Sequence, residues 1–418
     1  MSRDWALLRL GDFFSELPKS TLPASCAEAN GAYAFYCSSS EPKAADTWLQ
    51  EQPAILMGTG GVASVHLGKG KYAYSTDTWA IRIKESTKLN QPYAYRVLEL
   101  SLPKIDYAGF EGSGLRHLRK SYIKDFRFLA PSDSTPQKRI VSILDGIDTA
   151  IEKTEALIAK YQQIKAGLMH DLFTRGVLPN GQLRPPREQA PELYQETAIG
   201  WIPKGWEVVR MITLAEDRNG STTIGPFGSD LVATDYRQEG VPVVFVRDIK
   251  ESGFQWNSET YVSERKSQEL NAHSVKAGEV LATKMGLPPC ISCVYPDWMP
   301  NGVITADMIR LSPEKRKVDP DWLATAINQD RVIRQVAAIT AGVTRPKVTL
   351  ADFRAIKIAK PELDEQQRIS FRLNRIQDQI NIELARISKL QNQKLGLMHD
   401  LLTGKVPVKV KEPEAVDG

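Results

Sequence analysis

Two stretches of the chain are rich in lysine and arginine, and their chemistry indicates a polyanionic ligand. Residues 331–360 carry seven cations against the single acid Asp352: Arg331, Arg334, Arg345, Lys347, Arg354, Lys357 and Lys360. Residues 114–130 carry five against Asp125: Arg116, Arg119, Lys120, Lys124 and Arg127. Lysine and arginine bind phosphates and release condensed counterions. We therefore predict phosphate contacts in both stretches, although such runs also suit an ordinary solvated surface.

The cysteines do not have the spacing of a metal centre. Cys290 and Cys293 have the spacing of half a zinc site, but a structural zinc needs four ligands. The other cysteines, Cys26 and Cys37, lie far away in the sequence without that spacing. Four cysteines in no framework pattern also indicate reduced thiols, and hence a cytoplasmic protein. We expect no metal in this chain.

Catalytic motifs are absent as well. Gly58-Thr-Gly-Gly61 faintly resembles a dinucleotide loop, but such a loop must open a helix, and the residues that follow are typical of strand and turn. Gly68-Lys69-Gly70 lacks the upstream glycine and the Ser/Thr of a P-loop. His170 and His399 have no second ligand at helical spacing, and no Asn-Pro-Pro-aromatic motif for amino methylation occurs. We predict no reaction centre and no cofactor in this chain.

The bulk composition is that of a globular protein with several domains. The chain has 418 residues, of which 42% are apolar and 25% charged, and its mean hydropathy is −0.31. Its apolar runs are too short to span a bilayer, and the start, MSRDWALLRL, does not resemble a secretion signal. A net charge of +4 permits an acidic partner without requiring one.

One phrase occurs twice in the sequence. KAGLMHDLFTRGV fills residues 165–177, and KLGLMHDLLTGKV fills residues 394–406. We call the difference between these residue numbers the repeat offset. At this offset the match extends back to Gln137 and Gln366, and 19 of the 41 positions are identical. Both copies are rich in helix-favouring residues. Apolar residues recur with 4-3-4-3 spacing, which is typical of a helix that packs lengthwise on another helix.

The apolar seam of each copy is interrupted at matching places. Thr154 corresponds to Glu383, and Lys165 corresponds to Lys394, where apolar residues are expected. Two interpretations remain open. The polar residues could control the register or mark an exposed patch near a helix end, or the seam there could face something other than the matching helix.

The segments before the two helices also resemble each other. They open with Trp5-Ala-Leu-Leu-Arg-Leu10 and Trp206-Glu-Val-Val-Arg-Met211, and each continues through a strand with a glycine turn, a helix and a basic loop. The order predicts an α+β fold in which two mixed α/β domains alternate with two long helices. The predicted boundaries are 1–136 for the first domain, 137–175 for the first helix, 176–205 for a linker, 206–365 for the second domain, 366–404 for the second helix and 405–418 for a tail.

Five segments stand in a recognisable order. They are IGWIPKGWEVVRM (199–211), GPFGSDL (225–231), Tyr236 with EGVPVVFVRDIK (239–250), KAGEVLATKMG (276–286) and the helix QQRI…GLMHDLLTGKV (366–406). Together with the layout, they make nearly the whole chain resemble the DNA-specificity (S) subunit of type I restriction–modification enzymes. The first domain departs from the pattern, because it lacks the FGS-type segment and the Gly-Val-Pro strand.

The resemblance implies two target-recognition domains, each of which reads one half of a split, asymmetric DNA site. The two long helices would pair as an antiparallel coiled coil and hold the domains apart. They would also dock two copies of an adenine-methylating subunit, to which a DNA-translocating, cleaving subunit can be added. AdoMet, ATP and Mg²⁺ would belong to those partners, and this chain would be a non-catalytic recognition subunit.

Candidate contact residues follow from the resemblance and from the chemistry of base edges, which polar and basic side chains read in the major groove. For DNA they are Ser38, Ser39, Lys69, Lys71, Arg116, His117, Arg119, Lys120, Gly225, Phe227, Gly228, Ser229, Arg247, Lys284, Met285, Arg345 and Lys347. For the partner subunits they are Tyr161, Lys165, Leu168, Met169, His170, Leu172, Leu390, Lys394, Leu397, Met398, His399 and Leu401.

Two other function classes remain as alternatives. The chain could be a protein scaffold in which helical rods join two ligand-binding domains without any role on DNA. Binding that weakens steeply as salt rises would distinguish DNA recognition from such a scaffold. A fused methyltransferase with unrecognised motifs is the third hypothesis, and AdoMet binding by the isolated chain would reveal it.

Overall fold

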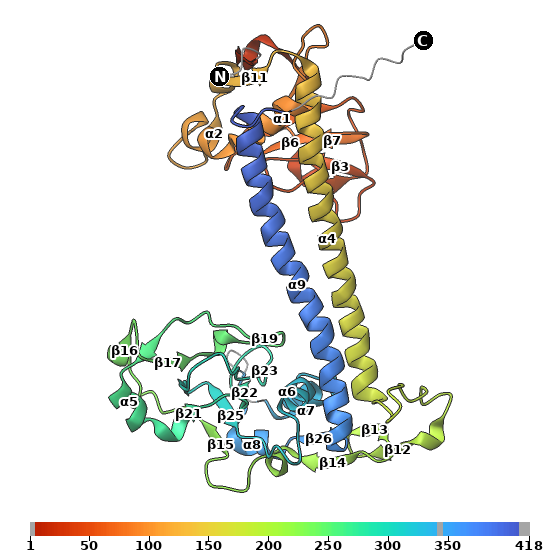
Figure 1. The fold of residues 1–418 in the computed structure, drawn as a ribbon, viewed down its shortest axis with the longest axis vertical. Helices are drawn as coiled ribbons and strands as arrows, with labels where there is room; N and C mark the ends of the chain where they lie inside the picture. Colours follow the sequence, from red (N-terminus) through yellow and green to blue (C-terminus); the bar gives the residue numbers. More distant parts are fainter. Residues whose placement is uncertain (1–4, 341–345, 409–418) are drawn as a thin grey trace. The chain divides into compact units, whose positions relative to one another are not determined.

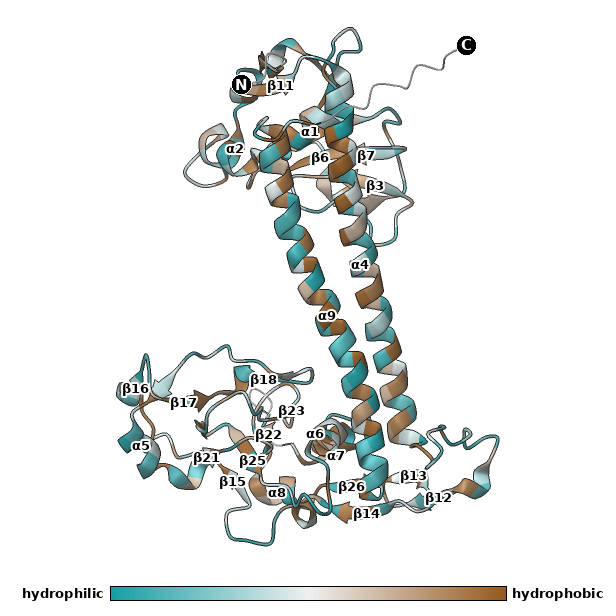
Figure 2. Ribbon diagram, in the orientation of Figure 1, coloured by the Kyte–Doolittle hydropathy of each residue, from teal (hydrophilic) through white to brown (hydrophobic). Residues whose placement is uncertain are grey.

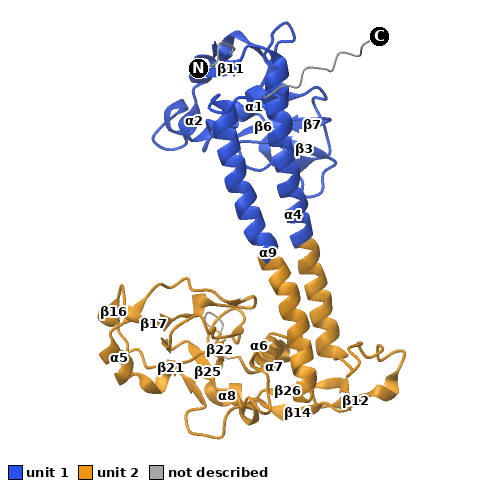
Figure 3. Cartoon of the chain, in the orientation of Figure 1, with its two compact units in different colours: residues 1–158, 382–418 blue, residues 159–381 orange. Residues whose placement is uncertain are grey.

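The computed structural model describes residues 5–340 and 346–408. The chain divides into two compact units, residues 1–158 with 382–418 and residues 159–381 (Figure 3). Each unit contains sheets, short helices and a part of both long helices, α4 (Ser134–Thr174) and α9 (Leu363–Leu402) (Figure 1). None of the described helices is long and apolar enough to cross a membrane.

The first unit is built on a four-stranded antiparallel sheet whose central strands are almost completely buried. Across this sheet the strands are β2 (Phe14–Glu16), β8 (Thr78–Ile83), β5 (Ala54–Gly58) and β6 (Val65–Gly68). A three-stranded sheet has the order β4 (Lys43–Ala45), β3 (Tyr33–Tyr36) and β7 (Tyr72–Tyr74), with β3 and β7 parallel. Two pairs complete the strands: β1 (Trp5–Arg9) with β11 (Arg127–Pro131), and β9 (Phe110–Glu111) with β10 (His117–Leu118). The short helices are α1 (Gln91–Leu100), α2 (Leu102–Gly109) and α3 (Lys120–Lys124).

The second unit repeats this plan with different lengths. Its four-stranded sheet has the order β15 (Thr222–Ile224), β25 (Met308–Leu311), β22 (Val280–Thr283) and β23 (Ser292–Val294). A five-stranded sheet has the order β16 (Tyr236–Arg237), β20 (Tyr261–Val262), β17 (Val241–Val244), β24 (Gly302–Ile304) and β21 (Ser274–Val275), with β17 and β24 parallel. Three pairs are β14 (Glu207–Arg210) with β26 (Lys357–Lys360), β12 (Tyr194–Thr197) with β13 (Gly200–Pro203), and β18 (Ile249–Lys250) with β19 (Gly253–Phe254). The helices are α5 (Glu264–Glu269), α6 (Pro320–Ile327), α7 (Asp330–Ile339) and α8 (Leu350–Ala355).

The junction between domain and long helix is built in the same way in both units. Asn90 caps α1 and Asp319 caps α6, and the repeat offset separates these two residues. The backbone N–H of Asn90 donates to Gln137 Oε1 at 2.7 Å, and that of Asp319 donates to Gln366 Oε1 at 2.9 Å. Each glutamine stands near the start of its long helix. The sequence repeat therefore includes the polar contact that fixes each long helix to its domain.

Apolar residues recur along both long helices (Figure 2). Ile140 and Leu144 of α4 are buried in the core of the first unit, and Ile369 and Leu373 of α9 are buried in that of the second. Thr154, one of the polar interruptions, is also buried, and its hydroxyl donates to the Ala150 carbonyl at 2.8 Å. The mixture of helices and strands confirms the predicted α+β class.

Candidate nucleic-acid interface

Three distant segments of the second unit meet at the turn that follows β22. Lys284 N–H donates to the Asp307 carbonyl at 2.7 Å, and its own carbonyl accepts from Val348 N–H at 3.0 Å. The next residue, Met285, forms an isolated antiparallel bridge with Lys347. The fold thus brings together three predicted DNA contacts, Lys284, Met285 and Lys347, although the third lies far from the other two in the sequence.

The first unit builds the same arrangement from different residues. Thr59 N–H donates to the Asp77 carbonyl at 2.9 Å, and Leu118 N–H donates to the Thr59 carbonyl at 3.0 Å. Gly60 forms an isolated bridge with His117. His117 therefore occupies the place that Lys347 has in the second unit, and both side chains are exposed. A glycine turn held against the basic segment is common to both domains.

Each turn presents an exposed aliphatic side chain directly after a glycine. Gly61 and Gly286 have φ angles of 83° and 154°, in the region where a side chain would be strained. Val62 and Leu287 follow them and are 70% and 86% exposed. Apolar side chains of this kind contact the thymine methyl group where a protein reads base edges in the major groove.

A groove of about 660 Å³ adjoins this turn in the second unit. Its lining includes three more predicted contacts, Phe227, Gly228 and Arg247, and Phe227 is 75% exposed. The Arg247 guanidinium lies over the Phe245 ring at 4.4 Å, which holds its flat face while leaving its N–H donors at the edge. Gly225 passes so close to Thr305 that a Cβ atom would lie 1.9 Å from the Thr305 carbonyl oxygen, so no larger residue fits there.

Several predicted contacts of the first domain instead hold its backbone. Ser38 Oγ donates to the Asp77 carbonyl at 2.6 Å and accepts from Thr59 N–H at 3.0 Å, so it positions the turn. Ser39 Oγ donates to the Glu41 carbonyl at 2.7 Å. In the second domain, the Ser229 hydroxyl donates to the carboxylate of the adjacent Asp230 at 3.2 Å. Lys69 and Lys71 are both exposed, and Lys71 Nζ lies 4.8 Å from the centroid of the Trp48 ring.

Most cations of the first basic stretch have acidic partners within their own domain. Arg116 binds the Asp106 carboxylate at 2.8 and 2.9 Å, and Lys124 contacts Glu16 at 2.7 Å. A hydrogen bond from the Ala63 N–H, with the Arg116 guanidinium, lowers the pKa of Asp106. The other two predicted cations are also engaged: Arg119 is 3.5 Å from Glu111, and Lys120 is 3.7 Å from Glu16. Because these acids lie outside the stretch, the sequence count overstated its free charge.

The second basic stretch divides into structural and exposed cations. Arg354 donates to Thr222 at 2.7 and 3.0 Å, and Arg331 donates to the Trp201 carbonyl at 2.9 Å. Burial lowers the pKa of Arg331. The exposed cations are Arg334, Lys347 and Lys357. Arg345 lies outside the described residues.

The cysteine pair of the second domain belongs to its apolar cores. Cys290 and Cys293 are buried, and burial raises the pKa of both thiols to about 12. Zinc binds the thiolate, which such surroundings disfavour. Within residues 5–340 and 346–408, no group of three or more His, Cys, Asp or Glu side chains is placed to hold a metal ion.

Comparison with known proteins identifies the family. The family model described as the type I restriction modification DNA specificity domain matches residues 2–163 and 290–392, which is more than half of the chain. The chain belongs to this family. The resemblance noted in the sequence is thereby confirmed, and the protein is a specificity subunit of the type I restriction–modification class.

Relatives match the specificity subunit over nearly its full length. The MjaVIII specificity subunit of Methanocaldococcus jannaschii is 22% identical over 430 residues, which cover 97% of this chain and 94% of the relative. The EcoDI specificity subunit of Escherichia coli is 22% identical over 408 residues, which cover 93% and 86%. Among solved structures, the S subunit of the type I restriction-modification system from M. genitalium has a TM-score of 0.62 at 14% identity, with 95% and 96% of the two chains covered. A chain from a structural study of complex assembly in the type I R-M system has a TM-score of 0.54 at 15% identity and covers 97% and 99%.

In this specificity subunit the repeated phrase packs the C-terminal end of each long helix into an apolar core, that of α4 in the second unit and that of α9 in the first. Six of the predicted partner contacts pack in or against apolar cores: Leu168, Met169, Leu172, Leu397, Met398 and Leu401. Tyr161 and Leu390 are half-buried, whereas His170 and His399 are exposed. Among these candidates, the two histidines are therefore the most accessible to a partner. Sequence periodicity identified the apolar positions but not what they pack against.

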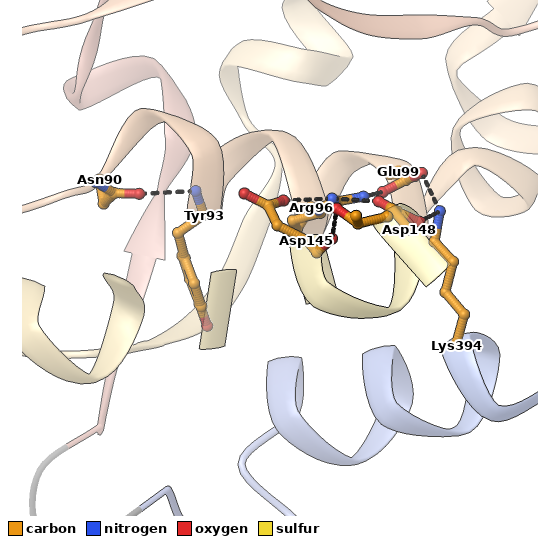
Figure 4. A network of polar contacts seen from close by, with 8 residues as sticks. Asn90, Tyr93, Arg96, Glu99, Asp145, Asp148 and Lys394 are labelled. Carbon is orange, nitrogen blue, oxygen red and sulfur yellow. Dashed lines mark hydrogen bonds and ion pairs between the residues drawn. The ribbon is translucent and has the colours of Figure 1, made fainter. Parts of the chain in front are cut away.

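Lys394 takes part in a network of ion pairs in the first unit (Figure 4). Its Nζ lies 2.8 Å from Asp148 Oδ1 and 3.1 Å from Glu99 Oε1. Arg96 of α1 contacts the same two carboxylates and also Asp145, at 2.6 Å. Burial acts to lower the pKa of Lys394, but Asp148 and Glu99 raise it above its ordinary value. The network joins two cations to three carboxylates from α1 and α4.

The matching lysine of the second unit has no such compensation. Lys165 donates a hydrogen bond of 2.6 Å to Gln377, and burial lowers its pKa. At the repeat offset, the second unit replaces Glu99, Asp145 and Asp148 by Asn328, Asn374 and Gln377, and it replaces Arg96 by Thr325. In both units the lysine faces the other long helix. Lys394 also contacts Glu99 of α1, so at this interruption the seam of the first unit meets a domain helix as well as the matching long helix.

Proposed function

We propose that this specificity subunit reads a two-part, gapped and asymmetric DNA site, one half with each domain. The observation that carries the proposal is the shared glycine turn, which in both domains presents an exposed aliphatic residue beside an exposed basic side chain, His117 or Lys347. Side chains on such turns reach base edges, while neighbouring cations bind phosphates. The two turns carry different residues, so the two half-sites differ.

The long helices act as the spacer between the two half-sites, paired as an antiparallel coiled coil. Two contacts support this pairing: Asp148 of α4 meets Lys394 of α9 in the first unit, and Lys165 meets Gln377 in the second. The step forward along α4 from Asp148 to Lys165 is as long as the step backward along α9 from Lys394 to Gln377. One uninterrupted antiparallel register has this property.

Two adenine-methylating subunits dock on the long helices, and they bring AdoMet, while a cleaving subunit brings ATP and Mg²⁺. Exposed apolar residues support docking on α9, namely Phe371, Ile382, Leu384 and Leu395. The corresponding residues of α4 are Ser142, Lys153, Glu155 and Ala166. Among the described residues, α4 exposes one large apolar side chain, Ile164, against these four of α9, so the two partners meet surfaces of different polarity.

Mapping methylated adenines in host DNA, with and without this gene, tests the proposal. We expect one motif with two short specified parts and an unspecified gap, and we expect it to vanish on deletion and return when the gene is restored. A continuous palindromic motif that depends on the gene, or a methylation pattern that does not change, would exclude this function.

A further inference from the structure

Both domains carry an aspartate at the same structural position, Asp77 in the first and Asp307 in the second. In each, the aspartate carbonyl accepts the first N–H of the glycine turn, from Thr59 at 2.9 Å and from Lys284 at 2.7 Å. The strand register agrees, since in each domain the residue after the aspartate pairs with the residue before that N–H. Asp307 lies one position beyond the residue that the repeat offset matches to Asp77, so the sequence repeat does not align the two aspartates.

The carboxylates of Asp77 and Asp307 make few contacts with the described residues of the chain. Asp307 is exposed, and its carboxylate makes no hydrogen bond or ion pair with the described residues. Asp77 is half-buried and accepts a hydrogen bond of 2.9 Å from the neighbouring Thr76 hydroxyl. Asp248 shows what a structural aspartate looks like in this protein. Its carboxylate is buried and accepts hydrogen bonds of 2.6 to 3.0 Å from Phe245 N–H, Asn257 N–H and the Ser258 hydroxyl. Turn formation therefore does not account for the free carboxylate of Asp307.

The surroundings of Asp307 indicate what such a carboxylate contacts. Asp307 lines the same groove as Arg247, beside the turn that carries Leu287. A carboxylate repels phosphates, so on a surface that meets DNA its favourable partners are the amino groups of bases. In the major groove, cytosine offers N4 and adenine offers N6 as donors, while guanine accepts from arginine at O6 and N7. A carboxylate and a guanidinium in one groove match the two bases of a G·C pair.

We propose that Asp77 and Asp307 are specificity-determining residues, and that each accepts a hydrogen bond from the exocyclic amino group of a base in its own domain's half-site. In the second domain, Arg247 donates to the guanine paired with that base. This inference rests on the proposed function, because it assigns bases to a DNA interface. The same position thus contributes one specified base to each half of the motif.

The test uses Asp77→Asn and Asp307→Asn in the full chain, expressed with its partner subunits, and maps the methylated motif of each complex. Asparagine is isosteric but donates as well as accepts, which suits adenine N6 and N7 rather than cytosine. We expect each variant to change the preference at one position of one half-site only, by roughly 5- to 150-fold, and we expect Asp307→Asn to lose the preference for cytosine there. Each variant is the control for the other, and Asp297→Asn, at an exposed site outside the groove, should leave the motif unchanged.

Binding of the variant complexes to duplexes without the motif separates base reading from folding. Because the substitution removes a negative charge, this nonspecific binding should stay equal or strengthen, even if methylation falls below detection. An unchanged motif in both variants, or a joint loss of specific and nonspecific binding, would overturn the inference. Failure of the proposed function is distinct, since the unsubstituted complex would then show no gapped motif.

Discussion

Replacing Lys394 by methionine is expected to destabilise the first unit by about 2 kcal/mol, whereas the same change at Lys165 should leave the second unit at least as stable. Without Lys394, Asp148 and Glu99 would share only Arg96, and three carboxylates would remain close together. This loss of unfolding free energy is smaller than the loss on breaking a fully buried ion pair, because the Lys394 side chain is 23% exposed. The Lys165→Met variant loses one hydrogen bond to the Gln377 amide, but it also removes a desolvated charge.

The pH dependence of the two effects has opposite sign. The folded pKa of Lys394 is raised above 10.5, so its stabilisation is complete below pH 10.5 and is lost as pH rises through the folded value. The folded pKa of Lys165 is lowered, so its cost is complete at low pH and is relieved as pH rises from that folded value towards 10.5. Urea unfolding of both variants between pH 7 and pH 11 measures this. Equal destabilisation by the two substitutions would contradict the charge asymmetry.

Replacing Glu365 by alanine should cost about 3 to 5 kcal/mol in the second unit, because it strips partners from several buried donors. The Glu365 side chain is 7% exposed and accepts from Arg184 at 2.5 and 3.0 Å. It also accepts from Trp206 Nε1 at 3.1 Å and from Val177 N–H at 2.7 Å. The carboxylate thereby fastens the linker and the first strand region of the second domain to the start of α9.

Thermal and urea unfolding of Glu365→Ala measure that cost, with Gln367→Ala as the control. Gln367 is exposed and lies just beyond Glu365 on the same helix, so its replacement should change the free energy of unfolding by less than about 0.5 kcal/mol. The first unit has Pro136 at the position matching Glu365 and should unfold as before. A loss below about 1 kcal/mol for Glu365→Ala, the net worth of one ordinary hydrogen bond, would show that the linker is held by other contacts.

The long helices and the secondary structure around the glycine turns could be predicted because local sequence encodes them. The repeat around GLMHDL spans α4 and α9, and its 4-3-4-3 spacing needs no tertiary information. The strands ending at Gly58 and Thr283 are short apolar runs closed by glycine turns, which are visible in the sequence. The same local pattern therefore gives a strand followed by a glycine turn in both domains.

The partners of individual side chains could not be predicted, because they come from distant segments. Arg116 looked free in a basic run, yet its carboxylate partner, Asp106, lies before the run and becomes adjacent only through folding. Leu172 and Leu401 repeat identically and suggested an external surface, but each is buried in its own unit. The equivalence of Asp77 and Asp307 is visible only in the strand register, because one extra residue in the second domain shifts Asp307 away from the repeat offset. Sequence identity alone does not distinguish internal packing from an exposed interface.

If the helix pair sets the distance between the two half-sites, shortening both helices together must shorten the gap between them. Residues 152–158 and 384–390 face each other if the register of Asp148 with Lys394 continues. Deleting both segments removes about 10 Å of coiled coil, or about three base pairs of DNA. We predict an unchanged pair of half-sites with a gap about three base pairs shorter, or loss of methylation where the rotated half-site no longer fits. Full methylation at the original gap, or new half-site bases at that gap, would show that the helices do not set the spacing.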